Sequence, residues 1–420
     1  MYPTMMGVIY EVVIFCLCFR LISVLVQGFV FPAVECLSLR RGGLSEVVGI
    51  LTFSLIGSLN EVGLSIVSSF KGNVDTDNSV VVCTILGSGW ISLLVLPVAA
   101  LNHGPFVVNW RSLGRDMAFY TLFCISVLLI GVHESSIALG SSLVMLLFGI
   151  YILVLVRMVE KERTIRQENR ERRLIFQMKP IAAVLNQFEA LDRLQTDLEI
   201  SRGPYIPLRD MTSSPPPLEL SDDSPLTIRR ESYLETSIEA RWLSKVCVRS
   251  LPGTDSERLY LVSLLNSSFL LLLLSSVICA VCDRWVSFVV GGLPSRFIGP
   301  LVVAGFSQLS EILHASTVPN SDAASHVVSS AMTRQVSILA LGVALPWMIR
   351  SALIGQSVQL DFESIRTCVK ASFLAITLFA TNCLICYRAG SLHFRSPWGF
   401  IGSYAVVLVV FAWMSASGFH

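Results

Sequence analysis

Two glutamates lie inside long apolar stretches of this chain. Glu61 ends the string GSLNE, which begins at Gly57, and Glu311 ends the string GFSQLSE, which begins at Gly305. A charge near the centre of a bilayer costs at least a few kcal/mol, so an ionisable residue at such a place indicates a functional role. Carboxylates, hydroxyls and amide oxygens are the hard ligands that Ca2+ and Na+ prefer. Both strings therefore predict an oxygen-lined cation site, with a protonated glutamate that hydrogen-bonds between helices as the alternative.

The composition indicates that a membrane surrounds these residues. Hydrophobic residues make up 53% of the 420 residues and charged residues only 15%, whereas soluble domains carry about 25% charged residues. A membrane-crossing helix needs about 20 mostly apolar residues. Ten segments approach or exceed that length: 7–33, 47–70, 79–101, 117–133, 138–157, 260–281, 297–317, 327–353, 367–387 and 398–417. We expect an all-α polytopic membrane protein with about ten transmembrane helices, the first of them too long for a cleaved signal.

One long polar region divides the spans into two groups of five. It predicts a first membrane half over 1–157, a loop over 158–258 and a second membrane half over 259–420. Arginines in this loop and in three shorter connections on the same side predict that the loop is cytosolic and that both termini lie outside. Within the loop we expect a helix over 158–200, then a disordered linker rich in Ser and Pro. Ser232, which follows two arginines, is a candidate site for a kinase.

The two glutamates occupy matching places in the two halves. Each lies in the second span of its half, among small and hydroxyl-bearing residues. Because the matching spans are five apart, an odd number, the two halves have opposite orientations in the membrane. Inverted repeats with binding groups near the bilayer midplane are a recurring architecture of transporters. The sequence thus predicts two inverted five-helix repeats that meet at one site.

Several other classes of function are disfavoured. The net charge is +1, so nothing indicates a nucleic-acid partner. The loop holds no nucleophile beside a base and no glycine-rich phosphate loop, so we expect no enzymatic activity and no cofactor. The 11 cysteines lie mostly in apolar runs, without zinc-type spacing. Glu11, Glu35, Glu46 and Asp116 lie near span ends, where we expect them to be solvated at the interface.

Further strings carry a resemblance to a known family. They are FVFPAVE at 29–35, GSLNE at 57–61, GS at 87–88, the pattern W..L.RD..FY at 110–120, and LPW at 345–347. Their order and spacing together are specific, and they extend over nearly all of the membrane region. The chain resembles the cation/calcium exchanger superfamily, and most closely the potassium-dependent sodium/calcium exchangers.

The resemblance implies antiport, in which Na+ and Ca2+ bind alternately to one site while the two halves rock. It places Glu61 and Glu311 at the two central acidic ligands. It also implies three hydroxyl ligands, which are Ser58, Ser88 and Ser307. The lipid bilayer and the transported ions are then the expected partners, and a homodimer is left open.

Two other functions stay open alongside Na+/Ca2+ exchange. The first is a cation/H+ exchanger of the same fold, in which His314, three residues after Glu311, would relay protons. The second is a transport-incompetent relative that serves as a regulatory or scaffold subunit. Ca2+ binding to the purified protein separates these classes, because a scaffold should show none.

The sequence departs from the family's pattern at the site itself. Asn60 stands where the family has a proline and Gln308 where it has a serine, so both join the predicted ligands. In span eight, Arg334 takes a serine's place and Ile338 takes an acid's place. Two carboxylates balance one Ca2+, and the lost acid argues against K+ coupling. We expect Arg334 either to act as a tethered cation where K+ would bind or to point away into a water-filled vestibule.

Overall fold

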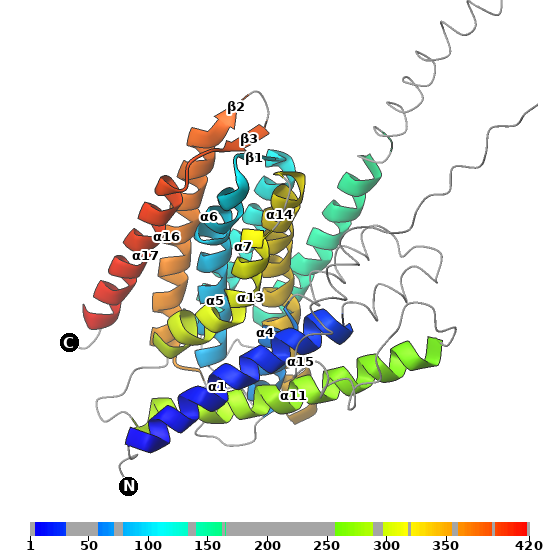
Figure 1. Ribbon diagram of the computed structural model, residues 1–420, viewed down its shortest axis with the longest axis vertical. Helices are drawn as coiled ribbons and strands as arrows, with labels where there is room; N and C mark the ends of the chain where they lie inside the picture. Colours follow the sequence, from blue (N-terminus) through cyan, green and yellow to red (C-terminus); the bar gives the residue numbers. More distant parts are fainter. Residues whose placement is uncertain are drawn as a thin grey trace, which may run out of the picture. The chain divides into compact units, whose positions relative to one another are not determined.

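The structure analysed is a computed structural model of the whole chain (Figure 1). It describes residues 5–30, 58–70, 79–132, 140–161, 164, 257–288, 297–317, 321–354, 360–388 and 391–417. The chain divides into two compact units, one of residues 1–152 with 234–420 and one of residues 153–233. The predicted loop helix, the linker and Ser232 lie almost entirely outside the described residues, and the division into domains stays a prediction.

The described part of the chain is helical where the sequence predicts membrane spans. In the first half these helices are α1 (Met5–Leu25) with the π-helical η1 (Val26–Val30), α4 (Leu59–Phe70), α5 (Ser79–Leu94) with α6 (Leu96–Ala100), α7 (Trp110–Val132), and the helix Gly140–Lys161. In the second half they are α11 (Glu257–Phe288), η4 (Ile298–Val303) with α13 (Ala304–Thr317), α14 (Ser321–Ser337) with η5 (Ile338–Ala344) and α15 (Leu345–Ile354), α16 (Phe362–Cys386), and α17 (Trp398–Ser417).

Each of the ten predicted spans therefore contains a helix. Eight helices in the described ranges are long and apolar enough to cross a membrane. The other two spans are the second, which is described only from Ser58 onward, and the seventh, whose apolar helix Ile298–Leu309 is shorter. The predicted all-α membrane fold is confirmed.

The helices of the two halves pack reciprocally. If α4 corresponds to α13, α5 to α14 with η5, and α7 to α16, each contact has a counterpart. The packing of α13 on α5 then matches that of α4 on η5, and the packing of α5 on α16 matches that of α14 on α7. A two-fold relation between the halves produces this pattern, and it brings the second and third spans of both halves together.

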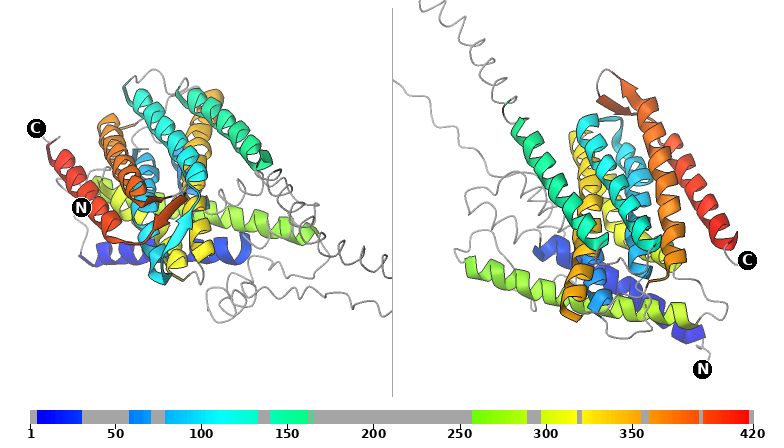
Figure 2. Two further views of the ribbon diagram at one scale, coloured as in Figure 1. Left: turned by 90° about the horizontal axis from the view of Figure 1, so that it is seen from above. Right: turned by 180° about the vertical axis from the view of Figure 1, so that it is seen from behind.

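Two long helices run across the ends of the others. Figures 1 and 2 show α1 and α11 side by side, at a steep angle to the bundle that contains α5, α7 and α16. Glu11 joins the pair, because its carboxylate accepts a hydrogen bond from Trp285 Nε1 at 3.0 Å and lies 3.4 Å from Arg284 Nη1. Its side chain is 18% exposed and its partner Arg284 is 64% exposed, so Glu11 is half-buried at the edge of the helix pair.

Helix α5 is the centre of the described fold, since all 16 of its residues are buried. Two glycines allow η4 to approach it backbone to backbone. A Cβ at Gly87 would collide with the backbone of Pro300, and a Cβ at Gly299 would lie 2.5 Å from the Val80 carbonyl oxygen and 2.9 Å from Cys83 Cβ. Small residues permit such close helix contact within membranes.

Gly299→Ala is therefore expected to separate α5 from η4. Overpacking of this kind typically costs about 1–3 kcal/mol, so the melting temperature of the purified protein should fall. Gly402→Ala is the matched control, because a Cβ at Gly402 of α17 has no neighbour within 4 Å and alanine favours a helix. A Gly299→Ala protein that melts with the native chain would contradict the close contact.

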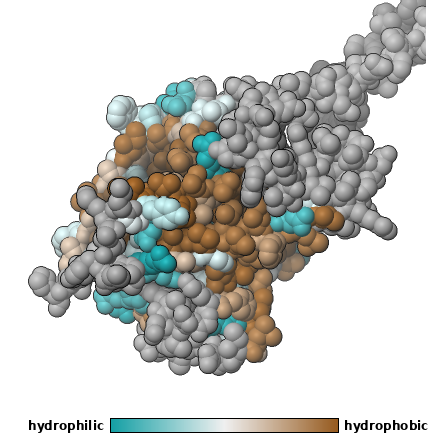
Figure 3. Space-filling model, turned by 60° about the horizontal axis from the view of Figure 1, so that its bottom comes forward, coloured by the Kyte–Doolittle hydropathy of each residue, from teal (hydrophilic) through white to brown (hydrophobic). Residues whose placement is uncertain are grey.

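The outer surface of the helices is apolar. Leu265, Phe269, Leu353, Leu384 and Val409 are each at least 69% exposed although they lie in long helices. Figure 3 shows hydrophobic residues spread over most of the described surface on one face of the molecule. Soluble monomers rarely expose patches this large, so the surface fits contact with lipid.

A small sheet joins two connections at one end of the bundle. Its strands are β1 (Phe106–Val108), β2 (Tyr387–Arg388) and β3 (Ser391–Phe394), in the order β1-β3-β2 with antiparallel pairing. The register puts Phe106 opposite Phe394. The sheet thereby ties the segment before α7 to the segment between α16 and α17.

Candidate cation-binding site

The site begins at Glu61, in the first turn of α4. The residue is 1% exposed, and its Oε1 accepts a hydrogen bond of 3.0 Å from Gln308 Nε2 on α13. A negative charge is stabilised at a helix N-terminus by the exposed N–H groups there. A buried carboxylate also requires partners, because burial without them is costly. Glu61 thus depends on a residue of the opposite half.

Gln308 links Glu61 to a cation. Its Oε1 accepts a hydrogen bond of 2.7 Å from Arg334 Nη2, while its Nε2 donates to Glu61. Arg334 is 4% exposed, and its Nη1 forms an ion pair with Oε1 of Glu311, which lies one turn after Gln308 on α13. One amide therefore connects the two predicted acidic residues through a buried arginine.

Helix α5 adds hydroxyl groups to this network. Ser92 Oγ donates to Gln308 Oε1 at 3.3 Å and accepts from Gln335 Nε2 at 3.0 Å. Ser88 Oγ lies 3.3 Å from Gln335 Oε1 and also donates to its own helix at the Ile85 carbonyl. The described network thus runs from Ser88 through Gln335, Ser92 and Gln308 to both carboxylates.

The remaining predicted ligands lie beside these residues along the chain. Ser58 is fully buried, and Ser307 is 5% exposed with its hydroxyl donated to the Ala304 carbonyl. Asn60 is 8% exposed, and its Oδ1 has no hydrogen-bond partner among the described residues. All seven predicted ligands thus fall on α5, on α13 or at the start of α4, the elements that form the network.

The charges of the network define its chemistry. Two carboxylates and one guanidinium give a formal charge of −1. The described residues contain no group of three or more His, Cys, Asp or Glu side chains that could hold a metal ion. The hydroxyl, amide and carboxylate oxygens of the network are hard ligands, which suit a hard cation.

The chain is similar to known cation exchangers. The sequence model of the family described as "Sodium/calcium exchanger protein" matches residues 10–159. The human "Sodium/potassium/calcium exchanger 5" is 30% identical over 151 residues, which are 36% of this chain and 29% of that protein. A crystal structure of the H+/Ca2+ exchanger CAX superposes with a TM-score of 0.50 over 99% of this chain and 88% of that one, at 12% identity.

The chain resembles the cation/calcium exchanger superfamily. Sequence similarity carries the resemblance in the first half, where the matched residues include Ser58, Asn60, Glu61 and Ser88. The match to CAX extends over nearly the whole chain and, at 12% identity, shows that the second half shares the fold of that exchanger. Together with the apolar spans, this resemblance makes the chain an integral membrane protein.

The structure assigns two polar residues of α14 to the site. Arg334 turns inward, so the alternative in which it points to a water-filled vestibule was wrong. Gln335 was not predicted as a site residue, although it is fully buried and bonded to Ser92. The signal was the run of three consecutive polar residues, Thr333 to Gln335, inside a predicted span.

Asp116, part of the exchanger-like pattern before span four, is fully buried. Arg115 Nε lies 2.7 Å from its Oδ1, Tyr151 Oη donates to Oδ1 at 3.1 Å, and Thr333 Oγ1 donates to Oδ2 at 2.8 Å. The expectation that Asp116 is solvated at the interface was wrong. Because Thr333 directly precedes Arg334, this cluster holds α14 in place beside the site.

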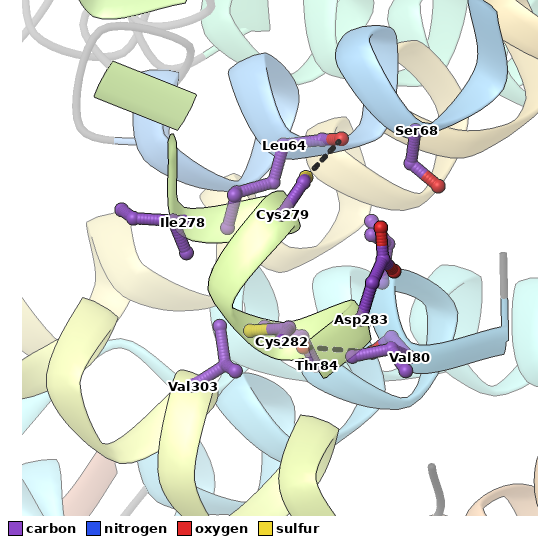
Figure 4. A pocket seen from close by; sticks show the side chains of 10 residues that line it. Leu64, Ser68, Val80, Thr84, Ile278, Cys279, Cys282, Asp283 and Val303 are labelled. Carbon is purple, nitrogen blue, oxygen red and sulfur yellow. Dashed lines mark hydrogen bonds between the residues drawn. The ribbon is translucent and has the colours of Figure 1, made fainter. Parts of the chain in front are cut away.

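A small pocket lies next to the site (Figure 4). Ser68 of α4 and Thr84 of α5 line it, together with Cys279, Cys282 and Asp283 of α11. Thr84 is one turn from Ser88 on α5, and Ser68 is two turns from Glu61 on α4. A stripe of hydroxyls spaced four residues apart (Thr84, Ser88, Ser92) thus runs from the pocket to the site.

Proposed function

We propose that this chain is a cation antiporter that exchanges Na+ for Ca2+ across a membrane by alternating access. The observation that carries the proposal is the buried network in which Glu61 of the first half and Glu311 of the second half meet through Gln308. A site shared between two halves becomes accessible from either side when one half moves against the other. The resemblance to the exchanger superfamily supports this reading of the geometry.

The matched stretch covers only 29% of the human relative's length, so we infer the identity of the transported ions from the ligands of the site. Hard oxygen ligands favour Ca2+ and Na+ over softer metals. Of the described charges at the site, only two are negative, and they suffice for one Ca2+ when Arg334 is withdrawn or for one Na+ while Arg334 is in place. Na+ and Ca2+ then compete for the same oxygens, as antiport requires.

A proton-coupled exchange is the second candidate. The match to an H+/Ca2+ exchanger shows the same fold but does not carry the coupling ion to this chain. His314, the residue that would relay protons, is exposed in the last turn of α13 rather than within the buried network. We therefore favour Na+ as the counter-ion and test H+ directly.

The test is 45Ca2+ uptake into proteoliposomes that contain the purified native chain. Outward gradients of Na+ or of H+ are imposed in turn, each with and without K+ and with an ionophore that collapses the gradient as control. Uptake driven by Na+ and abolished by the Na+ ionophore is the expected result. Uptake driven by H+ alone would show that the chain exchanges Ca2+ for H+. Folded protein that shows neither Na+-driven nor H+-driven uptake would overturn both exchange functions and support the regulatory or scaffold role.

A further inference from the structure

Arg334 lies where a bound cation would find its ligands. Its Nη1 is paired with the Glu311 carboxylate, and its Nη2 donates to Gln308 Oε1 at 2.7 Å. Both acceptors belong to the predicted ligand set. A guanidinium offers five N–H donors and stays charged at any accessible pH. The side chain therefore occupies part of the site with a permanent positive charge.

The charges of the site change with the position of Arg334. With the guanidinium in place, the formal charge is −1, which one monovalent cation balances. A Ca2+ ion would leave a charge of +1 in a buried site, and unbalanced buried charge is strongly unfavourable. Ca2+ is balanced only when Arg334 releases Glu311 and moves out of the site. The two carboxylates that remain then carry two negative charges.

The first turn of α4 holds a buried acceptor that is left unsatisfied among the described residues. Asn60 Oδ1 is buried and lacks a hydrogen-bond partner among the described residues, and it stands next to Glu61 in α4. Buried acceptors are nearly always satisfied, so an unsatisfied one in the same helix turn as Glu61 is a candidate ligand. Arg334 Nε also has no acceptor in the described structure, so the guanidinium is held through its two terminal nitrogens alone.

We propose that Arg334 is a built-in counter-cation, which occupies the Glu311 side of the site and leaves a site for one monovalent cation at Glu61. This inference rests on the proposed function and specifies how its site selects ions. Na+ binds with the guanidinium in place, whereas Ca2+ must displace it. The guanidinium also supplies the positive charge that a co-transported K+ would bring, so transport does not require K+.

Equilibrium binding of 45Ca2+ and 22Na+ to the purified protein tests the proposal independently of transport. Arg334→Gln removes the charge and keeps an amide, so Ca2+ affinity should rise at least about tenfold, because a positive charge within several ångströms repels a divalent ion strongly. Arg334→Lys keeps the charge, so its Ca2+ affinity should rise less than that of Arg334→Gln. Arg350→Gln is the matched control, since Arg350 is a buried arginine that bonds the Ser69 carbonyl outside the site.

Should Arg334→Gln fail to fold, Ile338→Asp provides a second test. Position 338 is one turn after Arg334 and fully buried, so a carboxylate there competes with Glu311 for the guanidinium. Ca2+ affinity should rise in that variant as well. Ca2+ affinity within twofold of native in whichever variant folds would overturn the proposal.

The outcomes separate this proposal from the proposed function. Native protein that fails to transport, with Ca2+ affinity raised in Arg334→Gln, would refute the antiporter and leave the counter-cation standing. Native protein that exchanges Na+ for Ca2+ only in the presence of K+ would refute the counter-cation and leave the antiporter standing.

Discussion

Glu61→Gln is expected to reduce Na+-driven Ca2+ uptake at least about 100-fold, because at about 4 Å a pair of unit charges is worth about 4 kcal/mol at the effective dielectric of a protein. Glutamine keeps the size of the side chain and an oxygen that still accepts the hydrogen bond from Gln308 Nε2. The fold should therefore survive. The formal charge of the site rises from −1 to zero, so neither Na+ nor Ca2+ is balanced there.

The measurement is initial 45Ca2+ uptake into proteoliposomes with equal amounts of folded protein. Glu363→Gln provides the matched control, because Glu363 is an exposed glutamate in the first turn of α16, away from the site. Uptake by the control should equal that of the native chain. If Glu61→Gln retained half of the native uptake, Glu61 could not be a central ligand and the site would have to be sought elsewhere.

The sequence predicted the spans and the acidic residues of the site because both depend on residue type alone. A run of apolar residues long enough to cross a bilayer must form a helix, since its backbone finds no hydrogen bonds in lipid. A glutamate in the middle of such a run needs a partner wherever the helix lies. Glu61 and Glu311 therefore stood out before any neighbour was known.

Asp116 shows where this kind of inference fails. Hydropathy placed the fourth span at 117–133, but α7 begins at Trp110, so Asp116 lies almost two turns inside the helix. Its burial depends on Thr333 and Tyr151, which come from other helices. The hydropathy of one segment does not reveal partners that come from other helices. The small sheet was missed for a related reason, because its strands are two to four residues long and show no period.

The direction of Arg334 was undecidable from the sequence. A polar residue in a span faces either a partner or water, and the choice depends on the rotation of the helix about its axis. In the structure the Asp116 cluster fixes this rotation, because Thr333 bonds Asp116 and the next residue then faces Gln308 and Glu311. The Asp116 cluster thus determines that the positive charge of Arg334 lies in the site.

The ion pair between Arg334 and Glu311 should contribute strongly to the stability of the protein. Glu311→Gln should destabilise the protein by about 3 kcal/mol, because removing one partner of a buried ion pair leaves an uncompensated buried charge. The value lies at the lower end of the usual range, since the Glu311 side chain is 22% exposed and water screens part of the loss. Glu61→Gln should cost less, because Arg334 keeps its ion partner in that variant.

The double variant Glu311→Gln with Arg334→Gln decides whether the lost stability comes from the charge. It removes both partners and leaves two amides, so most of the melting temperature should return, while Ca2+ uptake stays absent for want of a second carboxylate. Thermal unfolding of the purified single and double variants in one detergent measures this coupling. A double variant as unstable as Glu311→Gln alone would show that Glu311 supports the fold through contacts other than Arg334.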